Sequence, residues 1–148
     1  MQRPNIVFLF CDQQRFDTLG VNGQPLDMTP NLDALAFEGV NFLHAYTPQP
    51  VCGPARSCLQ SGLFATETGC FVNGISLPER QPTLAKSLRE AGYETAYVGK
   101  WHLATDREQN YETVAIPKER RGGYEDYWMA SDVLEFTSDG YGGFVFDR

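Results

Sequence analysis

The chain has 148 residues, of which 42% are hydrophobic and 13% aromatic, and its formal net charge is −7. This length and composition are typical of a globular domain with a real core, and they exclude a disordered chain. The acidic excess excludes a broad surface for nucleic acid or for anionic membranes, so an anionic ligand needs a local cationic site. The four cysteines form no Cys-x-x-Cys pair, which argues against a zinc knuckle or a thioredoxin-type redox site.

The first predicted element is a short strand near the N-terminus. Asn5–Cys11 is rich in β-branched and aromatic residues and lies between Pro4 and Asp12, as expected for a strand that is buried on both faces. Its apolar run is too short for a signal sequence or a membrane span. We therefore expect a soluble, cytoplasmic protein whose cysteines are reduced thiols.

Two helices are predicted in the next part of the chain. The first begins at Thr29 and Pro30, with threonine as N-cap and proline at the first helical position, and it ends at Gly39. The second has Pro54 in its first turn and runs to about Gln60.

A third helix and a second strand complete the predicted elements. Thr83 caps this helix, Gly92 ends it, and Tyr93–Val98 follows as a strand. The residues from 105 to 123 are polar, and Asp126–Phe136 is only weakly patterned. Strands that alternate with helices favour an α/β fold, with a mostly parallel or mixed sheet and helices on both faces.

Cys52 lies at the start of the second predicted helix. Unpaired backbone N–H groups and the helix dipole favour a thiolate or a bound anion at that position. A lone cysteine is usually buried and inert, which is what we expect of Cys58 inside the helix. Pro54 and Arg56 favour the anion site at Cys52, because Arg56 follows one helical turn later and can reach the same anion.

Two further pairs of residues follow the predicted strands. Asp12 and Gln13 offer oxygen ligands suited to Ca²⁺ or Mg²⁺ at a sheet edge, although on these two residues alone a solvated turn is the favoured interpretation. Lys100 and His102 are two positions apart, so in an extended segment both side chains point the same way. Taken alone, Lys100 is better explained as a solvated surface cation and His102 as a partly buried structural imidazole. His44, in an apolar segment, is expected to be a partly buried structural imidazole.

The order of these motifs resembles the N-terminal half of the type I sulfatases, in the alkaline-phosphatase-like superfamily. The matching strings are Cys11-Asp12-Gln13, Cys52-Gly-Pro-Ala-Arg56 and Gly99-Lys100-Trp101-His102. The resemblance covers roughly residues 4–104 and is looser beyond. It implies that residues 1–148 are the N-terminal portion of a single sulfatase catalytic domain, with the fold incomplete.

The resemblance also implies a mechanism and a role for each site residue. In this family a maturation enzyme oxidises the motif cysteine to formylglycine, an aldehyde whose hydrate attacks sulfur. By this resemblance Cys52 is the precursor of the nucleophile and Arg56 holds the hydrate. Lys100 neutralises a sulfate oxygen, and His102 assists the hydrate as acid or base. The expected substrate is a small-molecule or saccharide sulfate ester, with no nucleic-acid or membrane partner.

The metal ligands implied by the resemblance are Asp12, Gln13 and the modified Cys52, around Ca²⁺ or Mg²⁺. Asp17 either supports this metal or caps a helix. Most sulfatases have a second aspartate where this chain has Gln13, and a similar Asp-Gln pair occurs in phosphonate monoester hydrolases and choline-sulfatase-like members. The ester is therefore a sulfate or, alternatively, a phosphonate or phosphodiester.

The remaining family residues have no counterpart in this sequence. Sulfatases carry two more metal ligands, a lysine and a histidine in their second half, and residues 105–148 contain no such set. We therefore expect the isolated chain to be an inactive fragment of a sulfuric ester hydrolase. A non-catalytic module that binds anions is the third alternative.

Overall fold

The computed structural model describes residues 3–147. The chain divides after Tyr46 into two compact units. Within the described residues, no helix has both the length and the apolar character needed to cross a membrane.

The N-terminal unit is built from short helices. They are η1 (Phe16–Thr18), η2 (Gly20–Asn22) and α1 (Pro30–Glu38). Helix α1 begins and ends as predicted, with Thr29 at its N-cap and Gly39 at its C-cap. The Thr29 hydroxyl accepts a hydrogen bond from the Gly20 N–H (2.9 Å) rather than from its own helix. The cap residue therefore ties η2 to α1.

The predicted buried strand at Asn5–Cys11 is wrong. Residues 5–11 form no strand, and Val7 and Leu9 are 81% and 79% exposed. All strands of the described sheet lie between residues 96 and 147. A strand needs a paired neighbour and a layer on each face, which an apolar pattern cannot supply by itself. His44, expected to be partly buried, is exposed as well.

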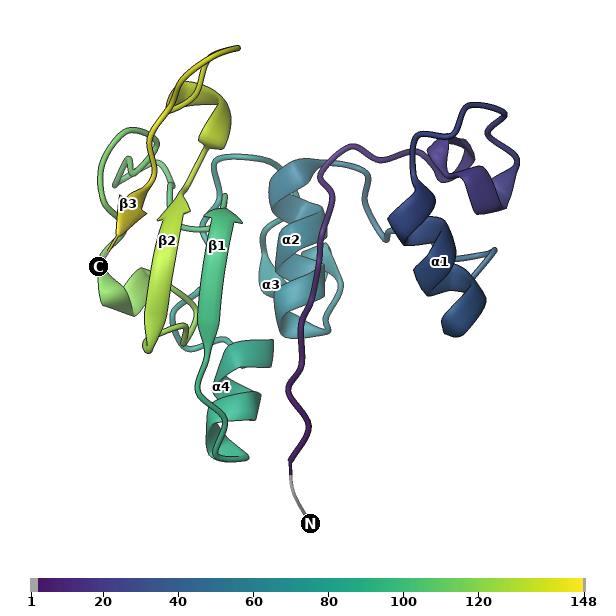
Figure 1. Ribbon diagram of the computed structural model, residues 1–148. Helices are drawn as coiled ribbons and strands as arrows, with labels where there is room; N and C mark the ends of the chain where they lie inside the picture. Colours follow the sequence, from purple (N-terminus) through teal and green to yellow (C-terminus); the bar gives the residue numbers. More distant parts are fainter. Residues whose placement is uncertain (1–2, 148) are drawn as a thin grey trace. The chain divides into compact units, whose positions relative to one another are not determined.

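The C-terminal unit contains a three-stranded mixed sheet in the order β1-β2-β3. Strand β1 (Ala96–Lys100) runs parallel to β2 (Tyr127–Ser131), and β3 (Phe146–Asp147) returns antiparallel beside β2 (Figure 1). This confirms the mixed α/β class. β1 starts and ends later than the predicted Tyr93–Val98, and β2 lies in a stretch whose pattern indicated no element.

The helices of this unit are α2 (Cys52–Ser61), α3 (Ala65–Thr68) and α4 (Leu84–Glu90), with short 3₁₀ turns η3 (Lys118–Arg120) and η4 (Leu134–Phe136). The predicted cap of α4 is confirmed, since the Thr83 hydroxyl accepts the Lys86 N–H. The N-terminus of α2 and the carboxyl ends of β1 and β2 lie at the same end of the unit (Figure 1). Parallel strands present their ligand-binding residues at that end.

Four aromatic rings form the centre of the core. Neighbouring rings lie with centroids 5.0 to 5.9 Å apart, and they belong to Tyr97, Trp101, Tyr124 and Trp128. Gly122 has a positive φ of 59°, and a Cβ there would lie 2.7 Å from Trp101. This glycine lets the turn after η3 close over the indole. Because Trp101 separates Lys100 from His102, the core anchors the segment that carries both residues.

Candidate active site

The start of α2 packs tightly against its surroundings. Cys52 is half-buried at the first helical position, and the next N–H, that of Gly53, donates to Asn73 Oδ1 (2.9 Å). A Cβ at Gly53 would lie 3.0 Å from that oxygen and 3.4 Å from the carbonyl oxygen of His102. Glycine at this position therefore lets Cys52 approach the segment after β1.

Arg56 connects the same helix to the end of β1. Its side chain is buried, and Nη1 donates to the Lys100 carbonyl oxygen (2.5 Å) and to the Tyr97 hydroxyl (3.3 Å). The Tyr97 hydroxyl also donates to the Lys100 carbonyl. Buried charge-assisted bonds of this kind are strong and directional, so the guanidinium has a defined orientation one turn from Cys52.

Lys100 is buried and forms an ion pair with Glu135. The Lys100 side chain is 6% exposed and the Glu135 side chain 57%. A carboxylate oxygen of Glu135 and the Sγ of Cys52 lie within 4.8 Å of one another. Glu135 lies in η4, and the sequence predicts no role for it, because no motif or spacing distinguishes it from a surface carboxylate.

His102 follows with an unusual backbone conformation. Its φ of 59° places a non-glycine residue in the left-handed region, where strain often accompanies function. Its Nδ1 is buried and has no hydrogen-bond partner within the described part of the chain. Burial, followed by the nearby charge of Lys100, lowers the pKa of His102. The imidazole is therefore neutral at physiological pH and can accept or donate a proton.

Asp132 holds the loop that follows His102. This carboxylate is fully buried at the end of β2 and accepts the N–H groups of Leu103 (3.0 Å), Ala104 (3.0 Å) and Thr105 (2.8 Å). In the sequence Asp132 carried no role, since the three amides it binds are distant along the chain. The structure makes it a positioning residue for the loop.

Four of the predicted site residues therefore come together at one end of the C-terminal unit: Cys52, Arg56, Lys100 and His102. Asp12 and Gln13 are exposed residues of the N-terminal unit.

Two further residues have clear structural roles. The Asp17 carboxylate pairs with the Arg15 guanidinium (3.0 Å to Nε), which lowers the pKa of Asp17. Cys58 is buried as predicted, and all four cysteines are free thiols.

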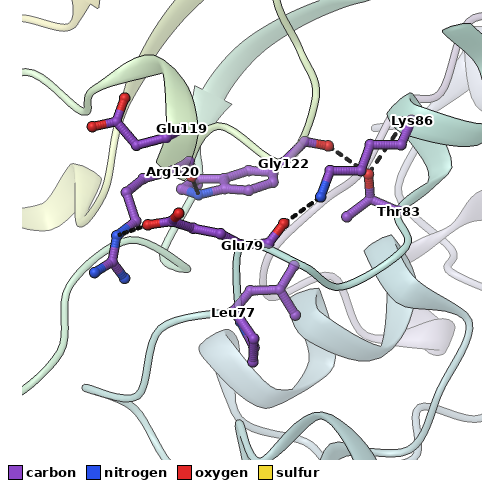
Figure 2. A pocket seen from close by; sticks show the side chains of 9 residues that line it. Leu77, Glu79, Thr83, Lys86, Glu119, Arg120 and Gly122 are labelled. Carbon is purple, nitrogen blue, oxygen red and sulfur yellow. Dashed lines mark hydrogen bonds and ion pairs between the residues drawn. The ribbon is translucent and has the colours of Figure 1, made fainter.

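A small pocket lies elsewhere, beside Trp101 (Figure 2). Both cationic side chains that line it already have partners. Arg120 Nε pairs with Glu79 (3.2 Å), and Lys86 Nζ donates to the carbonyl oxygens of Glu79 and Gln81. These contacts join the loop before α4 to η3 and to α4 itself, so the pocket is a structural junction.

Comparison with known proteins identifies relatives of the whole chain. The sulfatase family model matches residues 4–147. An ulvan-active sulfatase of Formosa agariphila is 46% identical over 137 residues, which cover 93% of this chain and 25% of that protein. The chain thus spans about a quarter of this relative's length.

Solved structures give the same answer for the fold. The structure of BT4656 in complex with its substrate D-glucosamine-2-N,6-O-disulfate has a TM-score of 0.80 at 31% identity, covering 99% of this chain and 27% of that chain. The phosphonate monoester hydrolase of Agrobacterium radiobacter has a TM-score of 0.62 at 30% identity, and the match covers 80% of this chain and 23% of that chain. The alkaline-phosphatase-like fold expected from the motifs is confirmed, and this chain contains part of it.

Proposed function

Because the chain belongs to the sulfatase family, we propose that it is the N-terminal part of a longer enzyme that hydrolyses sulfate esters through a nucleophile made from Cys52. The observation that carries this proposal is the convergence of Cys52, Arg56, Lys100 and His102 at one end of the sheet. A saccharide sulfate is the proposed substrate, since BT4656 binds a disulfated glucosamine.

Each residue of the site has a distinct role in this proposal. Once oxidised to formylglycine, position 52 supplies the hydroxyl that displaces the alcohol from sulfur. Arg56, fixed by the carbonyl of Lys100, orients that position. The Lys100 ammonium stabilises negative charge on the sulfate oxygens. The neutral imidazole of His102 takes the proton from the remaining hydroxyl of the hydrate, so that the aldehyde re-forms as the bond to sulfate breaks.

Asp12 and Gln13 are the type of ligand that a divalent cation prefers, but two residues supply too few ligands. A carboxylate and a carboxamide are the hard oxygen donors that Ca²⁺ or Mg²⁺ prefers, and such an ion neutralises sulfate charge during the reaction. Calcium takes six or more ligands, so two protein donors hold it weakly. We therefore expect strong metal binding and turnover only in the longer protein, and none in these 148 residues alone.

The proposal is tested in the longer protein, co-expressed with a formylglycine-generating enzyme. We expect hydrolysis of an aryl sulfate and hydrazide labelling at position 52, and we expect Cys52→Ala to abolish both. Labelling at position 52 also excludes the non-catalytic anion-binding module. Aryl sulfate turnover that survives in Cys52→Ala would disprove the proposed nucleophile.

A phosphonate monoester is the alternative substrate. Gln13 in place of the usual second aspartate and the likeness to a phosphonate monoester hydrolase favour it. The ratio of kcat/KM for an aryl sulfate and the matching aryl phosphonate separates the two, and we expect the sulfate to be preferred.

A further inference from the structure

Glu135 places a negative charge beside the groups that the proposed chemistry uses. Its carboxylate pairs with the Lys100 ammonium, and one of its oxygens and the Sγ of Cys52 lie within 4.8 Å of one another. Lys100 is 6% exposed and Glu135 is 57% exposed, so the carboxylate is the more accessible partner. An anion that reaches Lys100 therefore comes close to the Glu135 carboxylate.

The charged side chains of this end of the unit nearly balance. Arg56 and Lys100 contribute two positive charges, and Glu135 contributes one negative charge. Asp132 contributes a second negative charge, which is fully buried and accepts three backbone N–H groups. Burial keeps the pKa of His102 below its ordinary value, so this imidazole adds no charge. With two positive and two negative charges in this set, Glu135 is the one charged side chain of the four that is exposed to an incoming ligand.

We propose that Glu135 is a specificity-determining residue, which favours esters with one negative charge over esters with two. Sulfate esters and phosphonate monoesters carry a single charge, whereas a phosphate monoester is a dianion above its second pKa of about 6. Repulsion from Glu135 scales with the charge of the ligand, so it penalises the dianion twice as strongly. The inference rests on the proposed function, since it concerns the same site.

The test is anion binding to the longer protein, measured by calorimetry at pH 8 and low salt, where screening is weak. The probes are inorganic phosphate, mostly a dianion, and methyl sulfate, a monoanion. In Glu135→Gln we expect phosphate to bind about tenfold more tightly and methyl sulfate about threefold. Glu135→Asp retains the charge and should keep the ratio of phosphate to methyl sulfate affinity that the protein without substitutions shows.

Glu125→Gln is the matched control. The Glu125 side chain is 53% exposed and pairs with Arg89 at 3.5 Å, so it also loses an exposed ion pair, but outside the site. This variant should bind both anions with the same affinities as the protein without substitutions.

Equal gains for both anions, no gain in Glu135→Gln, or no binding of either anion would overturn the inference. Aryl sulfate turnover in the same samples reports separately on the proposed function. If Glu135→Gln turns over aryl sulfate but its ratio of phosphate to methyl sulfate affinity is unchanged, only the proposed role of Glu135 is disproved. The expected binding changes without turnover defeat only the hydrolase proposal.

Discussion

Replacing Asp132 by asparagine tests whether this buried carboxylate holds the loop after His102. Oδ1 accepts the N–H groups of Leu103 and Ala104, and Oδ2 accepts that of Thr105. Asparagine keeps one acceptor and turns an NH₂ group toward the remaining N–H. An unsatisfied buried donor costs about 1–3 kcal/mol, and the bonds that remain lose their charge assistance. We therefore expect a loss of about 2–4 kcal/mol in the free energy of unfolding.

The assay is urea denaturation of the longer protein, with hydrogen exchange as a local readout. With an m-value of about 2 kcal/mol/M, the midpoint should fall by roughly 1–2 M at constant m. The amides of Leu103, Ala104 and Thr105 should lose protection first. Asp139→Asn is the control, because exposed Asp139 binds the amides of a turn through Oδ1 alone, which asparagine retains. Equal midpoints for the two variants would refute the reasoning.

The remaining predictions concern a second carboxylate, a glycine and the metal. The Ser76 hydroxyl, then backbone N–H groups and a guanidinium, lower the pKa of Asp106 to about 2, and its side chain is 22% exposed. Because this pKa is depressed, the stabilisation is present above the unfolded value of about 3.9 and is lost as pH falls toward 2. Asp106→Asn should lower the free energy of unfolding by ~1–2 kcal/mol at pH 7 and leave it unchanged below pH 2, as measured by thermal unfolding across pH. A difference in stability that stays constant with pH would contradict this. Gly122→Ala should cost about 2–4 kcal/mol, because its Cβ would meet Trp101 at 2.7 Å. Gly62 also has a left-handed backbone but open space around it, so Gly62→Ala should lower the free energy of unfolding by only about 1 kcal/mol. Similar losses for the two variants in urea denaturation would rule out the clash at Gly122. A chelator should abolish aryl sulfate hydrolysis by the longer protein, Ca²⁺ or Mg²⁺ should restore it, and activity that persists in the chelator would count against the metal.

The local elements could be predicted from the sequence because their signals act over a few residues. Thr29 and Thr83 mark the starts of α1 and α4, and Gly39 marks the end of α1. The order of the motifs around Cys52 and Lys100 also identified the family. Motif strings carry such information without any knowledge of the contacts between them.

Only the tertiary structure decided which distant groups meet. Residues 5–11 have the pattern of a buried strand, yet strand pairing depends on neighbours, and these residues form no strand here. Glu135 and Asp132 looked like ordinary acidic residues until the fold brought one to Lys100 and the other to the amides of residues 103–105. Caps and motifs are local in the chain, whereas ion pairs and buried acceptors are set by chain segments that meet only on folding.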